Sequence, residues 1–115
     1  MRVLLDCRMA EWSGIGRYCK GLVRALGAMP ELDIVQMVAV GAEPPVRAAE
    51  AIEARHHPFT VRGAFEFGRI ARAVAPDLTH ALHFPTPRPA AHPLVVTLQD
   101  LTPLAVPGVM PSVAK

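Results

Sequence analysis

Apolar and polar residues follow one another along the chain in blocks whose lengths predict strands and helices. Arg2–Cys7 is a short, almost continuous apolar run, which is typical of a central parallel strand covered on both faces. Apolar residues then recur at helical spacing over Ile15–Leu26, so we expect a helix that opens at Gly14 and ends before Pro30. Asp33–Val40 is rich in β-branched residues and predicts a second strand.

The middle of the chain predicts a similar alternation. The alanine-rich stretch Val46–Ala54 predicts a short helix, and His57–Val61 predicts a short strand. Ala64–Val74 predicts a longer helix with one apolar face, which Pro76 ends because the residue before a proline resists helical backbone angles. Asp77–Leu82 follows as a further strand.

The last third begins with a proline-stiffened loop over His83–Pro93. Leu94–Leu98 predicts the clearest buried strand of the chain, and Leu101–Lys115 predicts a loop with the start of a helix. Strands that alternate with helices indicate an α/β fold with a Rossmann-like, three-layer parallel sheet. Such sheets bind ligands at the carboxyl ends of their strands.

Composition narrows the class of protein. The chain has 115 residues, which suits one domain, and its net charge of +2 comes from arginines spread along the chain, so it shows no nucleic-acid footprint. It has no apolar run as long as the roughly 18–20 residues of a membrane span, and we expect a cytoplasmic protein. Cys7 and Cys19 are then expected to be reduced, buried thiols.

Polar side chains gather where the predicted strands end, which marks the carboxyl edge as the working face of the sheet. They comprise Asp6, Arg8, His80, His83, Gln99 and Asp100. The spacing of His80 and His83 would place their rings on opposite faces of a strand, and no Cys or Glu cluster adds ligands, so no metal site is expected.

Several of these residues allow both a structural and a functional interpretation. His80 reads as a packed core histidine, whereas His83, at a strand end, is expected to face a ligand. Asp100 suits a structural cap as well as a catalytic role, and Gln99 cannot act as a general base because it does not titrate. The remaining histidines, His56, His57 and His92, are predicted to be solvated loop residues.

The turn Gly14-Ile15-Gly16 opens the first helix and has two interpretations. As a diphosphate cradle, it would offer free helix N–H groups and close backbone approach, with Arg17 adding charge. As a tight turn, it would need glycine for its backbone angles alone. The dinucleotide fingerprint fits poorly, because Cys19 stands where a small residue is needed, and the Walker phosphate loop is absent, so NAD and ATP enzymes are disfavoured.

Three blocks of the chain together resemble glycosyltransferase family 4, from Met1 to the end, with residues 47–60 carrying little of the likeness. The blocks are Asp6-Cys7-Arg8-Met9 with Gly14-Ile15-Gly16-Arg17-Tyr18, then Pro76-Asp77-Leu78-Thr79-His80, then the run from Val95 through Gln99-Asp100 to Leu104. The family consists of retaining enzymes of GT-B fold that use nucleotide sugars, including mannosyl- and other hexosyltransferases of polysaccharide assembly. The resemblance implies a hexosyltransferase that needs no metal or cofactor.

The same resemblance implies roles for individual residues. Gly14 and Gly16 would lie against the donor diphosphate, with Arg17 beside them, while Arg8 and His83 would lie on the acceptor side. Gln99 and Asp100 would take the catalytic position. The family usually has His-Asp there, so Gln99 keeps a hydrogen-bonding group but removes imidazole chemistry.

The chain is shorter than the resemblance requires. A GT-B enzyme works between two Rossmann-like domains, and the second domain, which holds most donor contacts, has no counterpart here. Residues 1–115 are therefore expected to form one truncated N-terminal domain that is inactive alone and self-associates through its uncovered sheet. The acceptor would be a glycan or a lipid-linked sugar, which leaves peripheral membrane contact of the full enzyme open. The alternative is a non-catalytic Rossmann-like module that binds a nucleotide or another anion.

Overall fold

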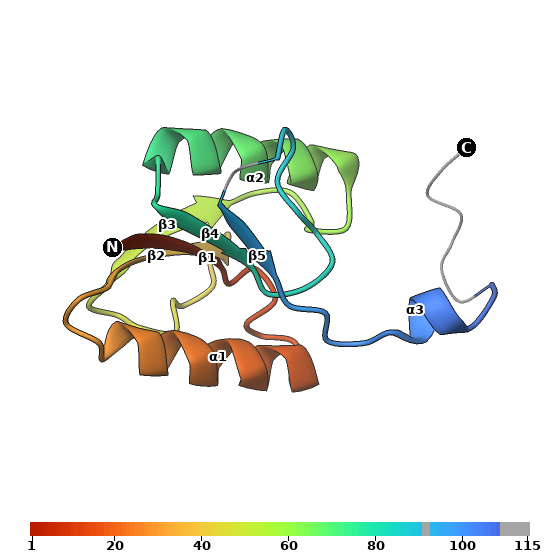
Figure 1. Ribbon diagram of the computed structural model, residues 1–115, viewed down its shortest axis with the longest axis horizontal. Helices are drawn as coiled ribbons and strands as arrows, with labels where there is room; N and C mark the ends of the chain where they lie inside the picture. Colours follow the sequence, from red (N-terminus) through yellow and green to blue (C-terminus); the bar gives the residue numbers. More distant parts are fainter. Residues whose placement is uncertain (91–92, 109–115) are drawn as a thin grey trace.

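A five-stranded parallel sheet lies between two long helices, and together they make a three-layer α/β fold (Figure 1). The computed structural model describes residues 1–90 and 93–108. In chain order the elements are β1 (Arg2–Asp6), α1 (Ser13–Gly27), β2 (Asp33–Ala39), β3 (Glu50–Ala54), α2 (Val61–Val74), β4 (Leu78–Ala81), β5 (Leu94–Val96) and the short α3 (Thr102–Ala105). This arrangement is compatible with a Rossmann-like fold.

Strand β1 is the centre of the sheet, whose order is β3-β2-β1-β4-β5. Leu4 and Leu5 are completely buried on opposite faces of this strand, which explains why its sequence is apolar without alternation. The prediction of a central strand over Arg2–Cys7 is thus confirmed to within a residue at its end.

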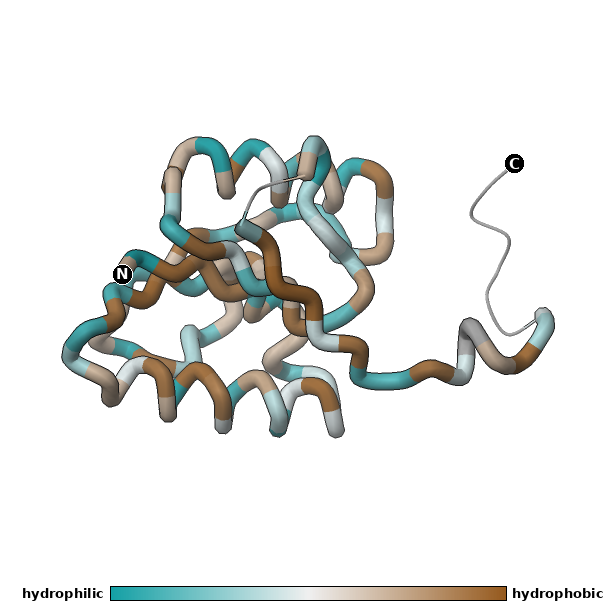
Figure 2. The backbone as a smooth tube through the Cα atoms, viewed as in Figure 1, coloured by the Kyte–Doolittle hydropathy of each residue, from teal (hydrophilic) through white to brown (hydrophobic). Residues whose placement is uncertain are grey.

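Each face of the sheet is covered by one helix with a single apolar stripe (Figure 1). Helix α1 packs Cys19 and Val23 onto the face that carries Val3 and Leu5. Helix α2 packs Phe67 and Ile70, with Ala71, onto the opposite face. The hydropathy colouring shows the same layering, with the most apolar backbone in the strands between the helices (Figure 2).

The helix predicted over Val46–Ala54 is wrong, because residues Glu50–Ala54 form β3 beside β2. The segment before it crosses the α1 face without a helix. The buried side chain of Gln36 holds it there, donating from Nε2 to the carbonyl of Val46 and accepting from the N–H of Val46, both at 2.9 Å. Long-range pairing with β2 therefore overrides a local sequence whose alanine, glutamate and arginine residues favour a helix.

The strand predicted over His57–Val61 is also wrong, because this stretch turns and leads into α2. Thr60 is the residue before the helix, and its Oγ1 accepts a hydrogen bond from the N–H of Gly63 at 3.0 Å. This cap makes α2 start at Val61, three residues earlier than the pattern Ala64–Val74 predicts.

The strand predicted over Leu94–Leu98 exists but is shorter than expected and is not buried. Strand β5 covers Leu94–Val96 at the edge of the sheet, and Val95 is 43% exposed. Its apolar run suits a strand that has a neighbour on each side, whereas here β4 is its one partner within the described residues. Exposed apolar side chains therefore continue past β5 to Leu98 and Leu101.

The end of the chain agrees in part with the sequence. Helix α3 is a single turn over Thr102–Ala105, within the region predicted to begin a helix. The remainder of that prediction, residues 109–115, lies outside the described residues, as do His92 and residue 91 of the predicted loop. Within residues 1–90 and 93–108, no helix combines the length and apolar character that crossing a bilayer requires.

Candidate functional site

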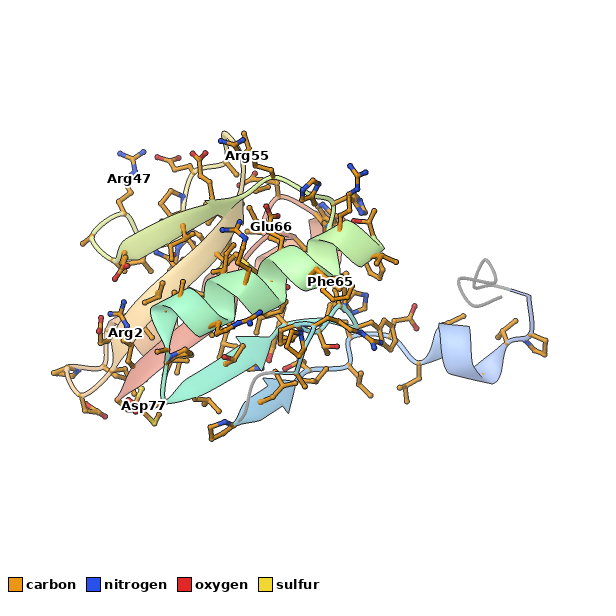
Figure 3. The ribbon with its side chains drawn as sticks, turned by 90° about the horizontal axis from the view of Figure 1, so that it is seen from above. Arg2, Arg47, Arg55, Phe65, Glu66 and Asp77 are labelled. Atoms are coloured by element: carbon orange, nitrogen blue, oxygen red, sulfur yellow. The ribbon has the colours of Figure 1, made fainter. Side chains whose placement is uncertain are left out.

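The amino edge of the sheet is closed by the chain's own ion pairs. The guanidinium of Arg2 donates to Asp33 at 2.6 Å and to Glu50 at 2.9 Å, and its backbone N–H donates to Asp77 at 2.7 Å. These contacts join the starts of β1, β2, β3 and β4. Figure 3 shows Arg2 and Asp77 side by side at this end. The polar groups of this edge therefore pair with one another across neighbouring strands.

At the carboxyl edge, Asp6 and Arg8 form a buried ion pair beneath the start of α2. Arg8 donates through Nε to Oδ1 of Asp6 at 2.8 Å and through Nη2 to Oδ2 at 2.7 Å, in a two-pronged geometry. Its Nη1 donates to the carbonyl of Gly63 at 3.1 Å, and its guanidinium lies 4.9 Å from the centre of the Phe67 ring. Arg8 is thus committed to contacts within the protein.

The start of α1 has no side-chain cap, whereas the start of α2 is capped by Thr60. Trp12 stands at the N-cap position of α1 and makes no side-chain capping hydrogen bond. The first turn contains no acidic residue. The N–H groups of such a turn point out of the helix and carry its partial positive charge. Anions are the ligands that this end favours.

The two glycines of the predicted phosphate turn differ in the space around them. A methyl group on Gly16 would overlap the carbonyl oxygen of Ala10, so this position needs glycine for the close packing of helix on loop. A methyl group on Gly14 would meet no atom within 4 Å. Neither glycine has a positive φ, so the backbone angles of the turn do not require them; close packing accounts for Gly16, and Gly14 is left facing open space.

Gly14 faces a cavity of about 490 Å³ that we call the α1-end cavity. It is lined by Trp12, Ser13, Gly14, Ile15, His83, Gln99 and Asp100. These residues follow β1, β4 and β5, and the sheet reverses its strand order between β1 and β4. The cavity therefore lies at the topological switch point, where open α/β sheets bind their ligands. Four predicted site residues, Gly14, His83, Gln99 and Asp100, are brought together there.

His83 is the buried polar group of this cavity. His83 is only 7% exposed, and its Nδ1 is buried without a hydrogen-bond partner in the part of the chain that the structure describes. Burial lowers the pKa of His83 below its ordinary value, while the negative charge of Asp100 acts in the opposite direction. His83 thus contributes to the cavity wall a ring whose hydrogen-bonding capacity the described residues do not use in full.

Gln99 and Asp100 are held in place by short-range contacts. The amide Nε2 of Gln99 donates to the carbonyl of Leu82 at 3.1 Å, which joins the segment after β5 to the segment after β4. Asp100 Oδ1 accepts from the N–H and the hydroxyl of Thr102, and these hydrogen bonds lower the pKa of Asp100. Asp100 thus accepts hydrogen bonds from the first residue of α3, although Leu101 is the N-cap residue of that helix.

His80 faces α1 and lies outside the α1-end cavity. Its Nε2 is 2.8 Å from the hydroxyl of Thr97, which in turn is 3.4 Å from the hydroxyl of Tyr18. Burial lowers the pKa of His80, in keeping with a packed histidine. Across the described residues, no group of three or more His, Cys, Asp or Glu side chains is arranged to hold a metal ion.

Other predicted residues lie apart from the cavity. Arg17 is exposed and lines a neighbouring hollow with Lys20 and Arg24, on the other side of Trp12 and Ser13. A further hollow of about 410 Å³ lies between the last turns of α2 and Pro89, with Arg72 as its charged residue. It is remote from the predicted site residues, so we give it no role in the site.

Sequence reasoning missed an aromatic group beside the cavity. The rings of Trp12 and Phe59 lie 5.8 Å apart at 16°, and His57, predicted to be a solvated loop residue, packs against both. Phe59 also meets the edge of His83, with ring centres 5.6 Å apart. The sequence gives little indication of this group, because Trp12 and Phe59 are isolated aromatic residues in loops that lie far apart along the chain.

Comparison with protein-family models, curated proteins and solved structures finds no match to this chain.

Proposed function

We propose that this chain is part of the N-terminal domain of a GT-B glycosyltransferase that resembles family 4. The whole cytoplasmic enzyme would transfer a hexose from a nucleotide sugar to a glycan or lipid-linked acceptor with retention of configuration. One observation carries the proposal: the uncapped start of α1 shares a cavity at the topological switch point with His83, Gln99 and Asp100.

In this proposal the donor diphosphate binds at the first turn of α1. The free N–H groups beside Gly14 supply hydrogen bonds and the helix dipole supplies a favourable field. Gly14 leaves room for a phosphate, Gly16 lets the turn pack closely, and Arg17 adds positive charge nearby. Arg8 acts indirectly, because its pair with Asp6 fixes the loop that carries the turn.

The reaction would rely on position and charge stabilisation. In retaining transfer, the leaving phosphate assists the attack of the acceptor hydroxyl on the same face of the donor sugar. His83 would donate or accept a hydrogen bond through Nδ1, and Gln99 would keep the segment after β5 beside it. Residues 1–115 alone are proposed to have no transferase activity, because the second wall of a GT-B cleft comes from another domain.

Binding of the diphosphate group tests the proposal directly. Calorimetric titration of residues 1–115 with inorganic pyrophosphate, UDP and GDP is expected to show binding by at least one of the three. The Gly14→Asp variant places a carboxylate at the start of α1 and should weaken that binding at least about tenfold through charge repulsion.

Gly21→Asp is the matched control for this experiment. Gly21 lies in the same helix and also has no atom within 4 Å of an added methyl group, but it is two turns from the helix start. The Gly21→Asp variant should bind the anions as tightly as the unchanged protein does. Equal loss in both variants, or no binding of any of the three anions, would count against the diphosphate site.

A non-catalytic module that binds a nucleotide or another anion is the second candidate. It is favoured by Gln99, whose amide is held by the carbonyl of Leu82 and cannot shuttle a proton. Replacing Gln99 by His in the complete protein separates the two candidates. A large gain in sugar transfer would identify a weakened enzyme, whereas binding without transfer in either form would support the module.

A further inference from the structure

Three aromatic rings beside the α1-end cavity pack against one another and stay partly exposed. Trp12 and Phe59 are 37% and 44% exposed, and their rings are nearly parallel, 16° apart. The ring centres of His57 and Trp12 are 5.7 Å apart, and Nδ1 of His57 accepts a hydrogen bond from the N–H of Phe59 at 3.1 Å. We call Trp12, His57 and Phe59 the aromatic platform. A surface of this kind costs solvation in water, because large apolar groups are kept exposed.

A second hollow opens on the other side of the platform, at the carboxyl ends of β2 and β3. It measures about 320 Å³, and we call it the β3-end hollow. It is lined by Arg8, Trp12, Ala39, Val40, Ala54, Arg55, His56, His57 and Pro58. Trp12 borders both this hollow and the α1-end cavity, so the platform connects two concave sites.

The β3-end hollow is cationic. No carboxylate is among its lining residues, and the charge of Arg8 is matched by Asp6. Arg55 forms no ion pair with any other described residue, which leaves its charge uncompensated at the rim. The nearby acid, Glu66, accepts from the N–H of His56 and lies 3.9 Å from Arg69 (Figure 3). A negatively charged ligand group is what this hollow favours.

We propose that the aromatic platform and the β3-end hollow bind a hexose that carries a negative charge, as the acceptor of the reaction. The pyranose ring would lie on the exposed part of Trp12, which Phe59 supports by stacking on it, and its phosphate or carboxylate would pair with Arg55. This inference rests on the proposed function, because the platform borders the cavity assigned to the donor diphosphate.

The chemistry of both partners supports a sugar. One face of a pyranose ring presents C–H groups that pack on an aromatic face, while its hydroxyls need polar neighbours at the rim. The platform places the ring of Trp12 at the wall of the hollow, and Arg55, His56 and His57 line the same hollow with polar groups. A guanidinium pairs with phosphate and with carboxylate in the same two-pronged geometry, so either anion suits the site.

Trp12 makes the proposal measurable, because it is the one tryptophan of the chain. Its fluorescence is titrated in residues 1–115 with glucose 6-phosphate, glucuronate, glucose, inorganic phosphate and AMP. The two charged hexoses should change the emission saturably, and glucose and phosphate should bind at least about tenfold more weakly. AMP binding as tightly as the charged hexoses would overturn the proposal and indicate a nucleotide site.

Substitutions on the platform locate the response. Arg55→Gln should weaken binding of both charged hexoses at least about tenfold, and Phe59→Ala should weaken it about three- to tenfold. The controls are Arg47→Gln, an exposed arginine on the segment before β3, and Phe65→Ala, an aromatic residue of α2 that is 57% exposed (Figure 3). Both controls should bind as the unchanged chain does, and equal weakening in a control and its partner would overturn the proposal.

The outcome is separable from that of the diphosphate site. Gly14→Asp should reduce pyrophosphate or nucleotide binding and leave hexose phosphate binding at Arg55 unchanged. Anion binding at α1 with no response to charged hexoses would overturn this inference alone. Should Phe59→Ala fail to fold, Arg55→Gln still decides the matter, since Arg55 is an exposed residue with no ion pair to lose among the described residues.

Discussion

Helices α1 and α2 start at the same edge of the sheet and have nearly equal lengths of 15 and 14 residues, but they begin in opposite ways. The start of α2 is capped by Thr60 and covered by the loop at His57, while Arg8 holds the carbonyl of Gly63 from below. The start of α1 has no side-chain cap and opens on a cavity. A parallel sheet thus presents equivalent helix ends, and the chain closes one of them with its own groups.

The closed end depends most on the ion pair beneath α2. Replacing Arg8 by Met would leave the charge of Asp6 buried without a partner, and we expect a loss of about 3–5 kcal/mol in the free energy of unfolding. Urea unfolding followed by circular dichroism measures this loss. The control is Arg47→Met, which removes an exposed pair with Glu43 and should cost at most about 1 kcal/mol. A loss below that of the control would mean that the pair does not support this end.

Substitutions of the glycines at the two helix starts should change the free energy of unfolding by smaller amounts, and only at the start of α2 should the change be a loss. A methyl group on Gly63 would overlap the carbonyl oxygen of His57, so Gly63→Ala should lower the free energy of unfolding by about 1–3 kcal/mol. Gly14→Ala meets open space and should leave stability unchanged or raise it by up to about 1 kcal/mol. Thermal unfolding of the two variants side by side is the measurement. Equal destabilisation would show that the start of α1 is packed as tightly as that of α2.

The smallest expected effect is a pH dependence on the α1 side of the switch point. Burial lowers the folded-state pKa of both His80 and His83, whereas an unfolded histidine titrates near pH 6.5. Between the folded and unfolded pKa values the unfolded chain binds more protons, so stability rises with pH through that window and is flat above it.

Unfolding free energies at pH 7.5 and 5.5 test this sign, with the lower value expected at the acidic pH. His83→Gln and His80→Gln should each flatten part of the slope. Stability that increased on acidification would instead mean that one of these rings gains an anionic partner in the folded protein.

Much of the fold follows from local patterns. β1 is recognisable because a strand buried on both faces is apolar at consecutive positions, as at Val3, Leu4 and Leu5. α1 and α2 are recognisable because each buries one stripe at helical spacing. These signals arise from the burial of each residue within its own element, so a single stretch of sequence contains them.

The errors concern elements whose identity depends on distant partners. Glu50–Ala54 is a strand because β2 pairs with it and Gln36 holds the preceding segment at Val46. Leu94–Val96 is apolar enough for a buried strand, but its exposure is set by its place at the sheet edge. Neither property can be read from the residues of the element itself.

The candidate site shows the same division. Gly14, His83, Gln99 and Asp100 could be anticipated together because the carboxyl ends of parallel strands meet at one edge. The committed side chain of Arg8 and the packing of Trp12 on Phe59 could not, since both depend on how the loop before α2 folds back over the sheet.

The position of β1 also has a consequence for how the chain folds as it is synthesised. β1 is made before both of its neighbours, β2 and β4, and β4 begins only at Leu78. At about 5–20 residues per second, a ribosome needs roughly 4–15 s to pass from the end of β1 to β4. During that interval the central strand of the sheet has no complete set of partners. The nascent chain is therefore expected to be a substrate for chaperones that hold apolar segments until Leu78–Ala81 emerges.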